Sequence, residues 1–247
     1  MSAAGLFLFS VLVAGTAFLA GVFGMAGGMI LMGALLFLVS VPDAMILHGI
    51  TQMTSNGWRA ALWRRYVNWR IVALYGVGLV AAGAVFSSLR LVPDERIIFL
   101  VLGIVPFLSR ALPGHLVPQV GRRWGAELCG FICTALQLLS GVSGPMLDVF
   151  FVRSGFDRRV IVATKAACQI ITHVAKLVYF GFLVGAATTN AFDPLILLAA
   201  VSMAILGTTL SRTVLERLSD HNFRRYTWWL VMAIGAVYLA RGIWGYL

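Results

Sequence analysis

The sequence predicts an all-α polytopic membrane protein with about ten transmembrane segments, built as two inverted repeats of five that each contain a glycine-broken short helix. Three observations support this prediction. The chain of 247 residues is 60% hydrophobic and only 11% charged, whereas a soluble domain carries about 25% charged residues. Two glycine-rich stretches interrupt apolar runs at corresponding places, and most Lys and Arg residues gather in alternate loops.

The apolar runs lie between the charged residues and the Gly and Pro residues of the chain. In the first half they cover residues 6–23, 29–41, 44–62, 70–89 and 96–110, and in the second half 124–140, 145–156, 159–184, 193–211 and 226–246. Most have the roughly 17–25 residues that a helix needs to cross hydrocarbon. The second and seventh runs reach only about 17–20 Å, so their crossing depends on the irregular segments beside them.

Charge placement favours ten crossings. Fourteen of the nineteen Lys and Arg residues lie in four clusters: Arg59, Arg64, Arg65 and Arg70; Arg110, Arg122 and Arg123; Arg153, Arg158 and Arg159; and Arg212, Arg217, Arg224 and Arg225. If every run crosses and the N-terminus lies outside, all four clusters are cytoplasmic, as the positive-inside rule requires. We therefore expect a first repeat over residues 1–112, a cytoplasmic linker over 113–123 and an inverted second repeat over 124–247.

The two glycine-rich breaks span Gly21–Gly28 and Ser140–Pro145. A break inside a membrane leaves backbone N–H and C=O groups unpaired, so it persists only where protein, water or a ligand satisfies them. Two breaks at corresponding places indicate a binding site between the repeats. The short helices that begin near Gly28 and Pro145 would point N-terminal N–H groups and the positive ends of their dipoles into that site.

A shift of 117 positions, without gaps, superposes the second half on the first. The aligned pairs are Gly24 with Gly141, Gly27 with Gly144, Met29 with Met146, Gln52 with Gln169, His48 with Lys165, Asn56 with His173 and Arg59 with Lys176. Because one offset holds over about 40 residues, we interpret the pairs as an internal repeat.

The third and eighth runs each carry a polar stripe. The members lie at spacings of 4, 4 and 3 residues: His48, Gln52, Asn56 and Arg59 in one run, and Lys165, Gln169, His173 and Lys176 in the other. They fall within an arc of about 80° on one helix face. Ionisable groups in a membrane helix cost several kcal/mol unless they face protein, water or a ligand, so we expect both stripes to face inward. The alternative is that they hold the bundle together by hydrogen bonds.

A cavity between the stripes would be rich in donors and almost free of fixed negative charge, which suits a small anion. The expected substrate-binding residues lie at the breaks and near mid-depth: Gly24, Gly27, Gly28, Gln52, Gly141, Gly144, Met146 and Gln169. The expected access routes are lined by His48, Asn56, Arg59, Lys165, His173 and Lys176. Asp148 is either a proton-coupling group or an acid paired with Lys165 or Arg153.

Other functional classes have little support in the sequence. Cys129, Cys133 and Cys168 lie in apolar segments without a CxxC pair, so we expect neither a disulfide framework nor a metal site. No cofactor and no catalytic residue is expected, and topology explains most of the net charge of +10, so nucleic acid is not an expected partner. The expected partners are a small anionic substrate and the lipid bilayer; a homo-oligomer stays open.

The breaks and the helices after them resemble a known family. Gly24-Met25-Ala26-Gly27-Gly28 with Gly49-Ile50-Thr51-Gln52, and Gly141-Val142-Ser143-Gly144-Pro145 with Ala166-Ala167-Cys168-Gln169, are similar to the duplicated elements of the TauE/SafE membrane permeases, or sulfite exporters. The family usually has a fuller run of glycines, a proline after each short helix, and Thr-Ser where this chain has Thr-Gln and Cys-Gln. The resemblance implies transport of sulfur oxyanions, organosulfonates such as sulfoacetate, or carboxylates across the bacterial inner membrane.

Two other functions stay open at this point. An anion channel could have the same architecture. Gly141-Val142-Ser143-Gly144 is also a GxSG element, similar to that of the rhomboid intramembrane serine proteases, with Ser143 as nucleophile and His173 as base. Against the protease, Ser143 corresponds to Ala26 in the repeat, which indicates a loop built for its backbone.

Overall fold

The structure is a computed structural model that describes residues 3–23, 25–113, 116–151, 154–184, 192–217 and 220–244. Within these residues it is helical, without a strand. The helices are α1 (Ala3–Phe23), α2 (Ala26–Leu36), α3 (Val41–Leu62), α4 (Trp69–Leu89), α5 (Glu95–Ala111), α6 (Gly125–Ser140), α7 (Gly144–Phe151), α8 (Arg158–Val178), α10 (Pro194–Arg217) and α11 (Asp220–Trp244). A 3-10 turn, η1 (Arg64–Tyr66), follows α3, and a π-helical segment, η2 (Tyr179–Leu183), follows α8.

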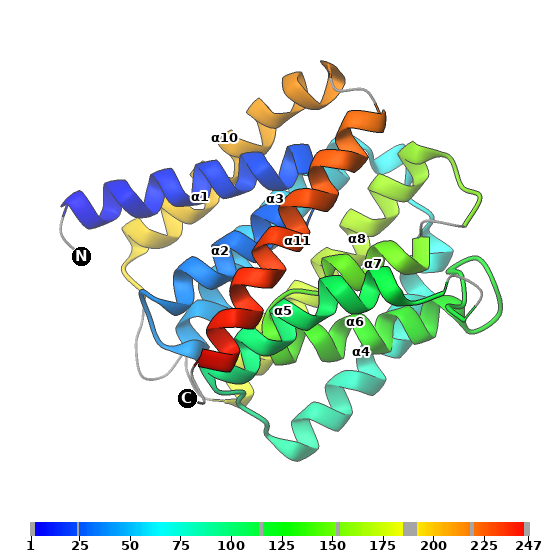
Figure 1. The fold of residues 1–247 in the computed structure, drawn as a ribbon, viewed down its shortest axis with the longest axis horizontal. Helices are drawn as coiled ribbons and strands as arrows, with labels where there is room; N and C mark the ends of the chain where they lie inside the picture. Colours follow the sequence, from blue (N-terminus) through cyan, green and yellow to red (C-terminus); the bar gives the residue numbers. More distant parts are fainter. Residues whose placement is uncertain are drawn as a thin grey trace.

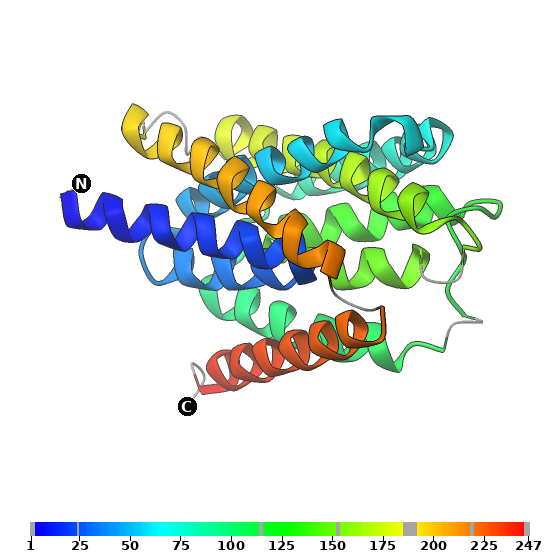
Figure 2. The same cartoon turned by 90° about the horizontal axis from the view of Figure 1, so that it is seen from above.

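The long helices cross the bundle from one side to the other, several of them inclined to one another, as α11 is to α1 (Figure 1). Figure 2 shows α1, α3, α5 and α10 running from left to right, and α4, α6, α8 and α11 running from right to left. The most extensive packing joins α1 to α10, α4 to α6, α5 to α11 and α3 to α8. The short helix α2 contacts α1, α3, α5 and α11, and the short helix α7 contacts α5 and α6. The two broken segments therefore lie inside the bundle rather than at its rim.

Polar side chains fix the starts of four helices. Ser40 caps α3, Asn68 caps α4, Asp94 caps α5 and Asp157 caps α8, each accepting a hydrogen bond from a backbone N–H of the first turn. A cap of this kind satisfies one of the N–H groups that have no partner within the helix. These residues account for the close agreement between the expected and observed starts of the long helices.

The second break ends α6 with a left-handed residue. Gly141 has φ +77° and its N–H donates to the carbonyl O of Gln137 at 2.9 Å. A Cβ at this position would lie 2.7 Å from the Met32 sulfur, so both the backbone conformation and the packing require glycine. In the first break, α1 ends at Phe23 and α2 begins at Ala26 after Met25; Gly24 lies outside the described residues.

The two short helices are shorter than their apolar runs. The sequence predicts them over 29–41 and 145–156, whereas α2 covers Ala26–Leu36 and α7 covers Gly144–Phe151. The predicted range 29–41 was wrong at both ends. Its start is too late because the glycines at 27 and 28 continue the helix, and its end is too late because the chain turns after Leu36 to reach the Ser40 cap. Apolarity alone does not distinguish a helix end from the apolar turn that follows it.

In the part of the chain that the structure describes, five helices are long and apolar enough to cross a membrane. They are Ala3–Phe23, Trp69–Leu89, Arg159–Leu183, Pro194–Val214 and Arg225–Trp244. Large apolar side chains on their outer faces are exposed, such as Phe7 at 67%, Val80 at 68% and Leu198 at 64%. A soluble protein rarely exposes so much contiguous apolar surface, so the chain is a multi-pass membrane protein.

Candidate functional site

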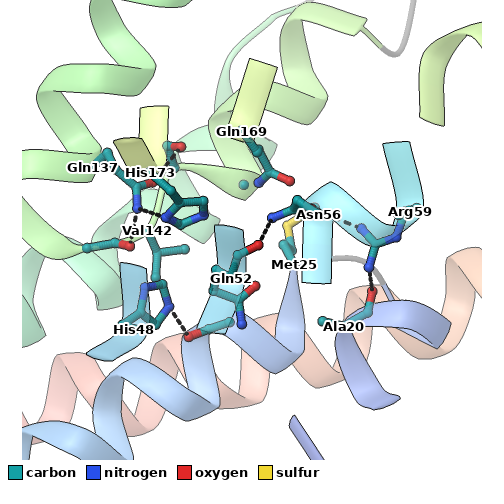
Figure 3. Close-up of a pocket in the computed structure, with 14 residues that line it drawn as sticks. Ala20, Met25, His48, Gln52, Asn56, Arg59, Gln137, Val142, Gln169 and His173 are labelled. Carbon is teal, nitrogen blue, oxygen red and sulfur yellow. Dashed lines mark hydrogen bonds between the residues drawn. The ribbon is translucent and has the colours of Figure 1, made fainter. Parts of the chain in front are cut away.

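A cavity lies where the two breaks meet α3 and α8. It is lined by Ala20, Met25, Gly28, His48, Gln52, Asn56, Arg59, Gln137, Gly141, Val142, Ser143, Gly144, Gln169 and His173. The positions that the centre of a water molecule can occupy in the cavity fill about 20 Å³. Measured in the same way, a site for one water needs roughly 10–15 Å³. In this conformation the cavity therefore has room for one or two water-sized groups. Figure 3 shows the polar side chains that surround it.

Gln52 presents an unused donor to the cavity. Its side chain is 6% exposed, and Nε2 has no hydrogen-bond partner among the described residues. Leaving a buried N–H unpaired costs about 1–3 kcal/mol. On α8, the side chain of Gln169 also reaches the cavity without a partner in the described part of the chain. The two amides are therefore free to donate to a ligand.

Arg59 is held at the cavity wall by neutral acceptors. Its Nη1 donates to Asn56 Oδ1 at 3.2 Å and its Nη2 donates to the carbonyl O of Ala20 at 3.2 Å, while Asn56 Nδ2 donates to the carbonyl O of Gln52 at 2.9 Å. These bonds connect the end of α1 to α3 (Figure 3). The guanidinium charge therefore has a fixed position beside the cavity.

The described residues that line the cavity bring positive charge and no carboxylate. They include Arg59 and neither Asp nor Glu. Two ion pairs of the bundle join Lys165 to Asp148 and Arg241 to Glu95, and none of these four side chains lines the cavity. An uncompensated cation in a poorly hydrated site attracts an anion strongly.

A second network fixes the orientation of His173. Gln137 Nε2 donates to the carbonyl O of Gly141 at 2.6 Å and to His173 Nδ1 at 3.1 Å, while Ser143 Oγ donates to Gln137 Oε1 at 3.0 Å. Because a carbonyl oxygen only accepts, the Gln137 amide has one orientation. His173 Nδ1 is then the acceptor, which places the ring proton on Nε2.

This network does not support the serine protease alternative. A nucleophilic serine needs its hydroxyl within hydrogen-bond reach of the base. The Ser143 hydroxyl instead donates to Gln137, and Gln137 stands between it and His173. Ser143 therefore stabilises the break that ends α6.

The structure brings nine of the expected site and access residues together around one cavity. They are Gly28, His48, Gln52, Asn56, Arg59, Gly141, Gly144, Gln169 and His173. His48, Asn56, Arg59 and His173, which we expected along access routes, share the cavity wall with the expected binding residues.

Five expected residues do not line the cavity, and Gly24 lies outside the described residues. They are Gly27, Met146, Asp148, Lys165 and Lys176. Gly27 packs against the α1 backbone at Thr16 and Ala20, and Met146 lies in an apolar cluster. Lys165 and Asp148 form an ion pair, as in the second interpretation given for that acid.

Sequence reasoning missed five residues of the lining. They are Ala20, Met25, Gln137, Val142 and Ser143, of which Ser143 was considered only as a nucleophile. The offset of 117 contains the missing signal, because it pairs Ala20 with Gln137 and Met25 with Val142. Gln137 is also an isolated amide in an apolar run, which alone predicts an inward position.

Comparison with known proteins identifies the family of the chain. The family model described as Sulfite exporter TauE/SafE matches residues 7–238, nearly the whole chain. Comparisons with curated proteins and with solved structures gave no match. The family implies a membrane transporter of the sulfite exporter type rather than an enzyme. The chain therefore belongs to the TauE/SafE sulfite exporter family.

Proposed function

We propose that this protein transports a small sulfur oxyanion or organosulfonate, such as sulfite or sulfoacetate, across the bacterial inner membrane by alternating access between two inverted repeats. The substrate binds in the cavity between the breaks. The observation that carries this proposal is the buried Nε2 of Gln52, which has no partner among the described residues. It lies in a cavity that Arg59 also lines.

The chemistry of the lining supports an anion. Oxyanions accept hydrogen bonds at every oxygen, and the cavity offers N–H donors from Gln52, Gln169 and the Nε2 of His173. The first turns of α2 and α7 begin beside it, at Ala26 and Gly144, where backbone N–H groups lack helical acceptors. The small volume available in this conformation favours a compact inorganic oxyanion or the sulfonate end of a larger one.

The packing of the helices supports the inverted repeat. The offset of 117 relates α1–α3 to α6–α8, and chain order relates α4 and α5 to α10 and α11. Under this exchange, the contact of α1 with α10 becomes that of α6 with α4, and the pairs α3 with α8 and α5 with α11 map onto themselves. The two halves also begin in opposite directions, with α1 running left to right and α6 right to left (Figure 2). We infer five crossings in each half, with residues 113–123 linking them.

A ligand screen followed by uptake measurements tests the proposal. Thermal shifts of the purified protein are measured with sulfite, sulfoacetate, thiosulfate and small carboxylates, and the anions that raise the Tm are tested for uptake into proteoliposomes. We expect a sulfur anion to stabilise the protein and to be transported in a saturable manner. Uptake proportional to concentration over a wide range would indicate a channel, and no stabilisation by any of these anions would contradict the proposal.

A further inference from the structure

Behind the cavity wall, α3 and α8 place an imidazole against an amine. Lys176 Nζ lies 2.7 Å from His48 Nδ1 and 3.3 Å from the carbonyl O of Gly141, and His48 Nε2 lies 3.0 Å from the carbonyl O of Gly28. The two side chains are buried, with exposures of 0% for Lys176 and 1% for His48. The pair thus connects the first break to the second.

The contacts limit the number of protons that the pair can hold. Since the carbonyl O of Gly28 only accepts, His48 Nε2 carries a proton. One further proton can lie between His48 Nδ1 and Lys176 Nζ, on either nitrogen. A state with both groups protonated would place two cationic donors 2.7 Å apart, without an acceptor between them. The pair therefore has a charge of +1 or 0.

In the described part of the chain, no negatively charged group faces the pair of Lys176 and His48. The helices of the pair carry Asp43 and Arg59 on α3, and Arg158, Arg159, Lys165, Cys168 and His173 on α8. The elements packed against them carry Arg70 and Tyr75 on α4, Glu127, Cys129 and Cys133 on α6, Arg212 on α10, Arg64, Arg65 and Tyr66 on η1, and Tyr179 on η2; Asp148 lies on α7 and Tyr238 on α11. The ring of His173 lies 5.7 Å from that of His48, Asp148 is paired with Lys165, and Glu127 lies in the first turn of α6. Tyr179 and Tyr238 donate to backbone carbonyls, and α2 has no titratable residue.

The charge of the pair is coupled to the cavity by geometry. His48 lines the cavity, and both carbonyls that hold the pair belong to lining residues, Gly28 and Gly141. A buried ammonium without a counter-ion is costly, and an anion in the cavity supplies the missing charge. Anion binding therefore favours the protonated pair, and protonation favours anion binding by the same factor.

We propose that Lys176 and His48 form the proton-coupling site of this transporter. The pair takes up one proton from solution when the anion binds and releases it when the anion leaves, so that each anion crosses with a proton. The inference rests on the proposed anion transport and replaces Asp148 in the coupling role, because that acid is paired away from the cavity.

The test is the number of protons taken up for each anion bound. Thiosulfate is titrated calorimetrically into the purified full-length protein in buffers of different ionisation enthalpy, from about pH 6 to 9. Thiosulfate does not itself titrate in this range. We expect the wild type to take up close to one proton per anion at the pH of maximum uptake. Binding without proton uptake across this range would overturn the inference and leave the proposed function intact.

Two variants assign the proton to the pair. Lys176→Arg carries a charge that is not lost at any of these pH values, so thiosulfate should still bind while proton uptake falls at least about fivefold. Arg241→Met, which removes a half-exposed cation paired with Glu95 at 3.9 Å, is the matched control and should take up protons as the wild type does. If Lys176→Arg takes up as many protons per anion as the wild type, the proton binds at a site other than this pair.

A transport measurement keeps the inference testable if Lys176→Arg does not fold. Wild-type proteoliposomes with a pH-sensitive dye inside are given an inward thiosulfate gradient without a pH gradient. The interior should acidify as thiosulfate enters. Thiosulfate uptake without acidification would overturn the coupling but not the transport, and a wild type that binds none of the screened anions would overturn both.

Discussion

The amide of Gln52 illustrates how a single side chain can define a site. It is buried, its Nε2 has no partner among the described residues, and its counterpart Gln169 reaches the same cavity from α8. A neutral donor that is lost from an anion site typically costs about 0.5–1.5 kcal/mol, and up to about 3 kcal/mol where a charged partner is left unsatisfied.

We therefore expect Gln52→Ala and Gln169→Ala each to weaken anion binding about 2- to 100-fold without unfolding the protein. Isothermal titration gives the affinity, and the Tm of each ligand-free variant shows whether the fold is retained. If both variants fold and bind like the wild type, the anion lies elsewhere and the stripes serve only to hold the bundle together.

Gly28 offers a steric test of the same position. A Cβ on Gly28 would lie 3.4 Å from Gln52 Oε1 and 3.7 Å from His48 Nε2, which are ordinary contact distances inside the cavity. Gly28→Ala should therefore fold normally, and its methyl group should compete with the anion for space. Overfilling a packed site costs about 1–3 kcal/mol, which predicts a loss of affinity of about 5- to 150-fold by titration.

The matched variant is Gly141→Ala, where the Cβ would meet the Met32 sulfur at 2.7 Å and the backbone has φ +77°. The left-handed conformation alone costs about 1–2 kcal/mol for a residue with a side chain. Gly141→Ala should lower the Tm of the ligand-free protein, whereas Gly28→Ala should not. Equal losses of Tm in the two variants would contradict the steric argument.

Ser143 provides a test of the chemistry that the structure argues against. Its hydroxyl donates to Gln137 Oε1 at 3.0 Å, and Ser143→Ala restores the residue type found at Ala26. Transport should persist, with a loss of stability of about 0.5–1.5 kcal/mol from the missing hydrogen bond. A fluorophosphonate probe should not label the wild type. Labelling that disappears in Ser143→Ala and in His173→Ala would restore the protease interpretation.

The spacing of the polar stripes predicts which residues share a helix face, but it does not predict their partners. Both stripes are on the expected face, since members of each line one cavity. The bond from Lys176 to His48 crosses from α8 to α3 and depends on how far the two helices are shifted along each other. The sequence has no signal for that shift, so Lys176 was expected along an access route.

At the scale of the elements, the breaks were predictable because a cluster of glycine and proline inside an apolar run usually marks the end of a helix. The caps Ser40, Asn68, Asp94 and Asp157 are also visible in the sequence. The exact extent of α2 and α7 was not predictable, because their ends depend on contacts with other helices. Gly27 shows this: its α-carbon packs against the α1 backbone at Thr16 and Ala20, a tertiary constraint rather than a ligand contact.

The π-helical segment η2 is another feature that the apolar run 159–184 does not predict. It covers Tyr179–Leu183, directly after the helical turn that contains Lys176. Tyr179 Oη donates to the carbonyl O of Leu91 at 2.8 Å and to that of Phe86 at 3.2 Å. These bonds anchor the end of α8 to the end of α4.

At the scale of the whole molecule, topology follows from where the helices end. Figure 2 shows that α3, α5 and α10 end, and α4, α6, α8 and α11 begin, at the same side of the bundle. The arginine-rich connections after α3 and before α6 lie at those ends. From the positive-inside rule we predict that this side is cytoplasmic, with the starts of α1, α3 and α5 on the opposite side.

Cysteine labelling in intact cells tests this topology with little background, because Cys129, Cys133 and Cys168 are buried. Arg64→Cys, on the exposed η1 turn, should react with a membrane-impermeant maleimide only after the cells are opened, whereas Asp94→Cys, at the exposed start of α5, should react in intact cells. The predicted ten crossings require these two positions to lie on opposite faces, since one helix, α4, separates them. Labelling of both positions from the same side would show that α4 does not cross the membrane. It would also contradict the inverted repeat on which alternating access depends.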